Sequence, residues 1–310
     1  MTSAVAAPGG SMDRVATSFL RACELDVAVR KPGNVSLDSP GHGMQAVQFT
    51  RSAQAAAGAL CRAGARVGAR IEAAQAASWA AAGCNTNLGI VLLCAPIAAA
   101  AERLPAATGP ADIARLGQAI EGVLAALDMD DARAAYRAIA QARPGGLGSA
   151  PSQDVHTQPT IGLREAMALA AGRDSIARQY RDGFAEVLAL AASALAAGFQ
   201  PGRPGDAVAP GTAQAVQRVF LATLARMPDS HIVRKHGEGM AQVVMAAAQS
   251  WHARAEQGEC LVADAAFAAW DTQLKNAGIN PGTTADLTVA ALMLAGVAHP
   301  AAQVHGTDRD

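Results

Sequence analysis

Apolar residues recur at three- and four-residue steps along most of the chain, which is the spacing of one face of an α-helix. In 111–127, for example, Ile113, Leu116, Ile120 and Leu124 form one apolar stripe. No segment combines period-two alternation with the composition of strands. The pattern therefore predicts an all-α, single-domain bundle of about 10–12 helices. The predicted helices span 12–29, 44–63, 65–82, 88–101, 111–127, 130–142, 161–172, 173–198, 212–226, 239–256, 262–277 and 284–297.

The composition favours the same fold. Hydrophobic residues make up 51% of the chain and aromatic residues only 4%. Alanine, the best helix former, accounts for about a quarter of the residues. The longest apolar runs, around Gly89–Ala101 and Val187–Phe199, are shorter than the roughly 18–20 residues that span a bilayer. We therefore expect two buried core helices and no membrane contact.

We expect one domain over 11–299, with disordered ends at 1–10 and 300–310 and a long surface loop at Gln200–Gly211. The net charge of −1 argues against a nucleic acid partner. The N-terminus shows no secretory signal, and the five cysteines have no C-x-x-C spacing. Both features favour a reducing cytoplasm. The sequence leaves a homodimer open.

Polar residues gather in short breaks between the apolar helices. If a helical bundle brings such breaks together at one end, they form a polar pocket that several helix N-termini face. Free N–H groups at helix N-termini bind anions. We therefore expect one functional pocket built from five breaks. They are 31–43, 83–89, 143–160, 227–237 and 278–286.

The first two breaks carry amides beside a turn or a helix start. In the first, Pro and Gly fix a turn that could present Lys31 and Asn34 from one side, although a plain helix–helix turn explains the same residues. In the second, Asn85, Thr86 and Asn87 precede an apolar helix. Such side chains can bind phosphate or contact a ribose, and helix capping alone accounts for one of the three.

The third break contains a glycine-rich run at 143–148, which lacks the G-K-[ST] ending of a P-loop. A flexible loop is its plainer interpretation. After this break, Arg173, Asp174 and Arg178 follow at the spacing of one helix face. That spacing is typical of a solvated, salt-bridged surface.

The fourth break is the densest in chemistry, with one carboxylate, two imidazoles and two cations. Asp229 could bind a divalent metal or act as a base, while Arg234 and Lys235 could hold a polyphosphate. A basic surface loop is the alternative. The group consists of Asp229, His231, Arg234, Lys235 and His236.

The fifth break starts a helix that carries Asp286 in its first turn, where capping and the helix dipole would explain it without any function. Lysine usage offers a further hint. Lys31, Lys235 and Lys275 are the only lysines among 25 basic residues. A lysine retained in an arginine-rich chain suggests a position where a planar guanidinium cannot replace a compact ammonium, although chance explains it equally well.

Together these segments resemble the triphosphoribosyl-dephospho-CoA synthase family. The shared motifs are an early K-P-G turn at 31–33, an N-T-x-x-G helix start at 85–89, a D-[ST]-x-[IV]-x-R-[KR]-x-G loop at 229–237 and a P-G-x-[ST]-A-D-L helix at 281–287. The resemblance implies an all-α fold. It also implies a reaction in which a hydroxyl of dephospho-CoA displaces adenine from C1 of the ATP ribose, to make a carrier-protein prosthetic group.

Two departures from the family pattern are visible. Asn87 and Leu88 stand where characterised synthases have His and Lys, and 41–44 reads G-H-G-M without an Asp before Met44. The chain looks closer to a divergent branch from methanogenic archaea and methylotrophic bacteria. That branch suggests a second candidate acceptor, a precursor of a tetrahydromethanopterin-type C1 cofactor. A non-catalytic nucleotide-binding protein and an enzyme that transfers the ribosyl group to water are further alternatives.

The resemblance leads to specific role predictions for a Mg²⁺–ATP site. We expect Asp229 and Asp286, with Asp130 or Asp131, to bind Mg²⁺. Asp229 is also the preferred base, assisted by His231, and Asp286 is the second catalytic carboxylate near C1. The predicted nucleotide-binding residues are Lys31, Asn34, Asn85, Thr86, Asn87, Arg234, Lys235 and His236.

Overall fold

The computed structural model describes residues 9–104 and 112–299, and within them the chain forms fourteen helices and no sheet. The all-α, single-domain prediction is confirmed. The expected disordered ends at 1–8 and 300–310 lie outside the described residues, while Gly9 and Gly10 already belong to the first helix. The helices are α1 (Gly9–Ala28), α2 (Ala46–Leu60), α3 (Val67–Ala82), α4 (Leu88–Glu102), α5 (Ile113–Ala125), α6 (Met129–Ala142), α7 (Leu163–Ala170), α8 (Ser175–Arg181), α9 (Ala185–Ala196), α10 (Pro210–Leu224), α11 (Ser230–His236), α12 (Glu238–Glu256), α13 (Ala265–Asn276) and α14 (Gly282–Ala298).

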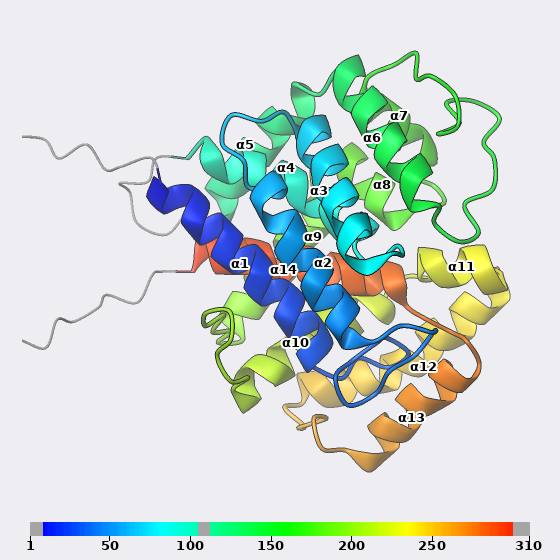
Figure 1. Ribbon diagram of the computed structural model, residues 1–310. Helices are drawn as coiled ribbons and strands as arrows, with labels where there is room; N and C mark the ends of the chain where they lie inside the picture. The colour runs from blue at the N-terminus through cyan, green and yellow to red at the C-terminus, as the bar shows by residue number, and fades with distance from the viewer. Residues whose placement is uncertain (1–8, 105–111, 300–310) are drawn as a thin grey trace, which may run out of the picture.

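Two apolar helices, α4 and α14, form the centre of the bundle. α14 packs against α1, α4, α9 and α10 (Figure 1). Every α14 residue from Thr283 to Ala298 is buried except Asp286, and every α4 residue from Ile90 to Ala101 is buried. The prediction of a buried core helix at Gly89–Ala101 is therefore confirmed.

Pro96 lies inside α4, where it removes the N–H that would bond to the carbonyl oxygen of Leu92. The hydroxyl of Tyr180 in α8 donates a hydrogen bond to that oxygen at 2.6 Å. The side chain of Tyr180 is fully buried. A tertiary contact thus satisfies the backbone group that proline leaves free, and it fixes α8 against the centre of α4.

The predicted helix 173–198 is two helices, because the chain turns between α8 and α9. Gly183 and Phe184 both have positive φ, at 66° and 60°. The expected second core helix at Val187–Phe199 was wrong in part. α9 buries one face, which includes Val187, Leu190 and Ala194, and exposes the other.

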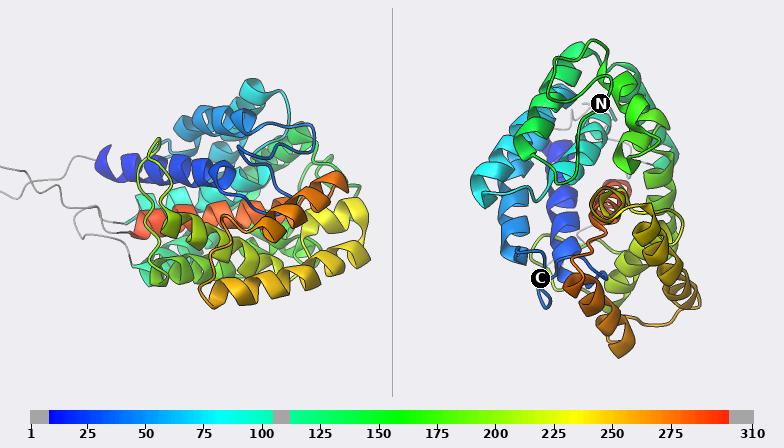
Figure 2. Two further views of the ribbon diagram at one scale, coloured as in Figure 1. Left: turned by 90° about the horizontal axis from the view of Figure 1, so that it is seen from below. Right: turned by 90° about the vertical axis from the view of Figure 1, so that its right-hand side faces the viewer.

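Helices α10 to α13 surround a second, smaller apolar cluster that contains Phe220, Ile232 and Phe267. Figure 2 shows α12 and α13 on the side of the bundle opposite α5 and α6. α11 falls within the polar break predicted at 227–237, and together with the division of 173–198 it raises the number of helices above the prediction. The predicted loop at 200–211 is present before α10, and Arg21 fastens it by donating to the carbonyl oxygen of Pro201 at 2.7 Å.

No helix in the described ranges is both long and apolar enough to cross a membrane.

Candidate active site

All five polar breaks contribute residues to one cavity of about 590 Å³. This volume is within the range of small-molecule sites. The cavity lies where the C-terminal end of α1 meets the N-terminal ends of α4, α8, α11 and α14. Figure 1 shows the 143–160 loop running down towards α11, beside the start of α14. The predicted convergence of the breaks on one pocket is thus confirmed.

Asp286 is the only charged residue of α14, and its side chain lines this cavity. Gly89, at the start of α4, lies directly against it. A Cβ atom on Gly89 would come within 2.0 Å of Asp286 Oδ2. Burial raises the pKa of Asp286 well above its usual range, and the nearby carboxylates of Asp26 and Asp229 raise it further. The structure therefore favours a protonated carboxyl group at the meeting point of the two central helices.

Gly89→Ala is expected to lower turnover at least tenfold while leaving stability almost unchanged. The added methyl group meets the flexible carboxylate end of Asp286 and the Cδ1 atom of Ile176. These groups can move at little cost. Alanine in a helix is more stable than glycine by about 0.5–1 kcal/mol, which offsets the cost of that movement. A displaced catalytic group nevertheless loses much of its effect. Thermal unfolding and steady-state kinetics test the prediction, which normal activity in the Gly89→Ala variant would contradict.

Asp26 also lines the cavity, from the last turn of α1. Its side chain is buried and forms an ion pair with Lys31, whose Nζ lies 3.1 Å from Asp26 Oδ1. Lys31 has no exposed surface and also donates to the carbonyl oxygens of Asp26 and Val29. Burial raises the pKa of Asp26, and the Lys31 ammonium lowers it. Lys31 therefore lies behind the cavity wall, and it is not among the lining residues.

Asp229 occupies a different environment from the one predicted. It is the N-cap of α11, and its Oδ1 accepts hydrogen bonds from the N–H groups of His231 and Ile232 at 2.8 and 3.0 Å. Its Oδ2 accepts from the N–H and hydroxyl of Thr284, both at 2.7 Å. Asp229 is buried and does not line the cavity. Its carboxylate joins α11 to α14, and both oxygens are already used.

His231 does line the cavity, and its Nε2 is buried without a hydrogen-bond partner. Burial lowers the pKa of His231 to about 3, and the positive charges of Lys235 and Arg234 act in the same direction. The imidazole is therefore neutral at physiological pH. A neutral ring with a free nitrogen can accept or donate one hydrogen bond to a ligand.

The His231 pKa predicts a pH dependence of stability. In the unfolded chain the imidazole binds a proton below about pH 6.5, whereas in the folded protein it stays neutral to about pH 3. The unfolded state thus binds more protons in this window, so stability falls as the pH falls. Between pH 7 and pH 5 the wild type should lose up to about 2 kcal/mol more than His231→Gln. Urea unfolding at both pH values measures the difference, and parallel losses would refute the shift.

Arg234 and Asp174 form an ion pair of 2.8 Å across the cavity wall. Asp174 also N-caps α8 through its Oδ1, and its ion pair is with Arg234 of α11 rather than with the neighbouring Arg173 or Arg178. Arg234 Nε is buried without a partner. Arg173 is exposed and also lines the cavity. Two backbone hydrogen bonds lower the pKa of Asp154, and the positive charge of Arg173 lowers it further. Two guanidinium groups therefore face the cavity.

The amides of the first two breaks divide into lining and supporting residues. Asn34 lines the cavity and donates to Asn280 Oδ1 at 3.1 Å. Asn85 and Thr86 also line it. Asn87 is buried behind them, with its amide 2.8 Å from Ser52 Oγ, so it ties the start of α4 to α2.

The remaining predicted residues lie outside the cavity lining. Lys235 is exposed, and His236 Nε2 lies 3.1 Å from the carbonyl oxygen of Gly278. Asp130 is exposed and paired with Arg133. Asp131 is buried and accepts from the N–H of Gly68 at 2.8 Å, which joins α6 to α3. Of the four predicted magnesium ligands, Asp286 is the one that faces the cavity.

The glycine-rich run forms part of the cavity wall and packs on α11. A Cβ atom on Gly146 would lie 2.9 Å from the carbonyl oxygen of Arg234, and Gly146 has a φ of 74°. Tyr136 supports the following loop by donating to the carbonyl oxygen of Gln153 at 2.8 Å. The loop is therefore held in place at Gly146 and at Gln153.

Comparison with known proteins identifies the family of this chain. The sequence profile of the CitG family, ATP:dephospho-CoA triphosphoribosyl transferase, matches residues 12–304. The chain belongs to this family. It is a transferase of the triphosphoribosyl-dephospho-CoA synthase type, for which ATP is a substrate.

A solved structure with a similar fold comes from Archaeoglobus fulgidus and is named as a triphosphoribosyl-dephospho-CoA synthase. It is 22% identical to this transferase, has a TM-score of 0.60, and covers 81% of this chain and 99% of its own. At this identity the likeness supports the fold alone. No protein with curated function matches the chain.

Sequence reasoning overlooked Asp26 in the transferase. A signal for it was present, because carboxylates are disfavoured in the last turn of a helix, where the dipole is negative. Asp26 lies in that turn of α1. Its position there, five residues before one of the three lysines, was the signal for a paired charge.

Proposed function

We propose that the cavity is the active site of this transferase and that Asp286 is its acid. In the reaction the bond between C1 of the ATP ribose and adenine breaks, and adenine keeps the electron pair. A hydroxyl oxygen of dephospho-CoA forms the new bond to C1. The observation that carries the proposal is a raised-pKa carboxyl group, on an otherwise buried apolar helix, that faces a cavity of nucleotide size.

Asp286 would donate its proton to a nitrogen of the departing adenine. A protonated base is a better leaving group, and a carboxyl with a raised pKa holds its proton until the reaction needs it. As adenine leaves, positive charge develops on the ribose. The carboxylate of Asp26, which lines the same cavity, would stabilise that charge.

Arg234 and Arg173 are the proposed contacts for the triphosphate. Both line the cavity, and the buried Nε of Arg234 lacks a partner that a phosphate oxygen could supply. Asn34, Asn85 and Thr86 would contact the ribose or base by hydrogen bonds. Lys235 is proposed only for the outer phosphate, because its side chain is exposed beside Gly145.

Magnesium is proposed as the counter-ion of the triphosphate. The described residues contain no group of three or more His, Cys, Asp or Glu side chains that could hold a metal by themselves. Such a site fits Mg²⁺ that arrives on phosphate oxygens and takes one or two carboxylate ligands at most. The location proposed is the cytoplasm, since the five cysteines are free thiols.

One incubation tests the function. The purified protein is mixed with ATP, Mg²⁺ and dephospho-CoA, and mass spectrometry follows free adenine and a product that carries the triphosphoribosyl group. Adenine release that requires the acceptor supports transfer to dephospho-CoA. Adenine release without any acceptor would identify transfer to water, and ATP binding without adenine release would identify a binding protein.

A further inference from the structure

Asp26 and Lys31 form a buried ion pair at the wall of the proposed active site. We propose that Asp26 is the carboxylate that accepts the proton of the acceptor hydroxyl, and that Lys31 is the positioning residue that holds Asp26 in place. The inference rests on the proposed function, because it concerns the second substrate of the same reaction.

The position of Asp26 destabilises the fold unless another group compensates for its charge. A carboxylate at the C-terminal turn of a helix faces the negative end of the dipole, and a buried carboxylate is costly unless hydrogen bonds or a charged partner stabilise it. The side chain of Asp26 is only 6% exposed. Lys31 offsets both costs, because its ammonium contacts the carboxylate, the carbonyl oxygen of Asp26 in the last turn of α1 and that of Val29 just after the helix.

The pair leaves part of the carboxylate available to a ligand. Lys31 lies 3.1 Å from Asp26 Oδ1, and no second donor to Asp26 is found in the described part of the chain. The residue nevertheless lines the cavity together with Asn34, Asn280 and Asp286. A hydroxyl group that enters the cavity can therefore donate to Oδ2 while Lys31 stays in place.

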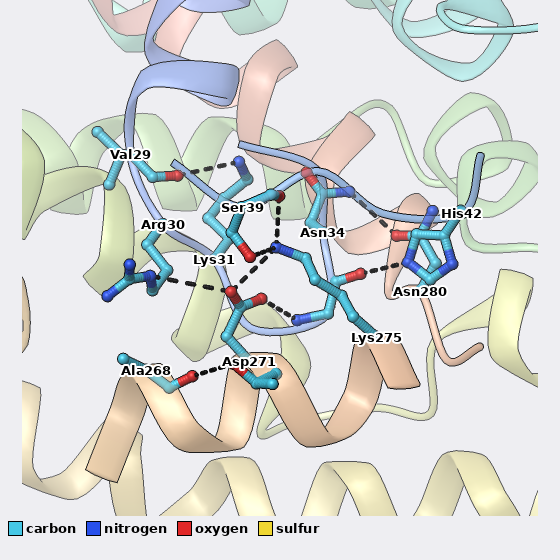
Figure 3. Close-up of polar contacts among 12 residues, drawn as sticks. Val29, Arg30, Lys31, Asn34, Ser39, His42, Ala268, Asp271, Lys275 and Asn280 are labelled. Carbon is cyan, nitrogen blue, oxygen red and sulfur yellow. Dashed lines mark hydrogen bonds and ion pairs between the residues drawn. The ribbon is translucent and has the colours of Figure 1, made fainter. Parts of the chain in front are cut away.

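A second lysine–aspartate pair nearby shows what a purely structural pair looks like. Asp271 Oδ1 accepts from the N–H of Gly33 at 2.8 Å, and its Oδ2 accepts from Lys275 Nζ at 2.9 Å (Figure 3). Lys275 also donates to the carbonyl oxygen of Ser39 at 2.8 Å. Neither Asp271 nor Lys275 lines the cavity. This pair fastens the 31–43 loop to α13, and it uses both carboxylate oxygens.

Asp26 and Asp286, two of the carboxyl groups that line the cavity, then balance the reaction. The acceptor hydroxyl passes its proton to Asp26 as its oxygen bonds to C1. The C1–N bond breaks, and adenine takes the electron pair together with the proton of Asp286. One carboxyl gains a proton and the other loses one, so exchange with water restores the starting state. No oxidant, reductant or further reactant is needed.

The test compares the two pairs by steady-state kinetics. Asp26→Asn should lower kcat by about 10²–10⁴-fold, with KM for ATP changed less than about threefold. Lys31→Met should lower kcat through Asp26, and the double variant should be no slower than Asp26→Asn alone, because residues that act as a unit are not additive. The control Asp271→Asn/Lys275→Met should lower the unfolding temperature and change kcat less than about fivefold.

The double variant Asp26→Asn/Lys31→Met removes both charges, so it keeps the test valid if a single variant leaves a buried charge and fails to fold. A folded double variant with wild-type kcat would overturn the inference, and so would additive effects of the two substitutions. A wild type that transfers to no acceptor would instead refute the proposed function. Loss of ATP binding in Asp26→Asn, measured by calorimetry, would overturn the inference by assigning Asp26 to the nucleotide rather than to the acceptor.

Discussion

Asp286→Asn is expected to lower kcat for adenine release by about 10²–10⁴-fold, the usual contribution of a positioned general acid. Asparagine has nearly the shape of a protonated aspartic acid and fits between Gly89 and the cavity. It has no proton to give to the leaving base. ATP affinity should therefore remain within about threefold of the wild type. Liquid chromatography of released adenine measures kcat, and calorimetry measures the affinity for ATP.

Glu165→Gln provides the control for charge removal. Glu165 is an exposed carboxylate in the first turn of α7 and does not line the cavity. This control should retain the wild-type kcat. If Asp286→Asn instead loses ATP affinity, and high Mg²⁺ restores its turnover, Asp286 binds the metal as the sequence predicted and the acid is another group.

The spacing of apolar and polar residues was enough to predict the central helices of this fold and the position of its polar pocket. The apolar run from Ile90 to Ala101 has no polar face, and such a helix is stable only when it is buried on all sides. The five polar breaks were predicted to converge because breaks that meet at one end of a helical bundle form a polar pocket faced by helix N-termini. Both expectations depend on helix-scale periodicity, which a single sequence displays directly.

Tertiary partners explain what the sequence did not predict. The seven-residue helix α11 is too short to show periodicity, and its cap, Asp229, bonds to Thr284, which is 55 positions away. A pattern around Asp229 alone cannot distinguish a cap from a base. Lys31 is a similar case, because its charge looked available for phosphate until the fold placed it against Asp26. Of the three lysines in this arginine-rich chain, Lys31 and Lys275 have side chains that are almost fully buried in ion pairs, whereas Lys235 is exposed.

Asp229→Asn is expected to lower the free energy of unfolding by about 2–4 kcal/mol, because a buried charged acceptor is lost. An Asn amide can keep its oxygen towards the N–H groups of α11, but its NH₂ group would then face the N–H of Thr284, which is also a donor. Burial raises the pKa of Asp229, and its hydrogen bonds to Thr284 oppose that rise, so the carboxylate form depends on this network.

Urea unfolding measures the loss, and kcat per folded molecule should stay within about tenfold of the wild type because Asp229 does not line the cavity. Thr284→Val is the graded control. It removes one hydroxyl hydrogen bond and keeps the backbone one, so it should cost about 1 kcal/mol. The opposite pattern, with stability unchanged and kcat reduced a hundredfold in Asp229→Asn, would return Asp229 to the role of base. It would also require the carboxylate to release Thr284 and enter the cavity during the reaction.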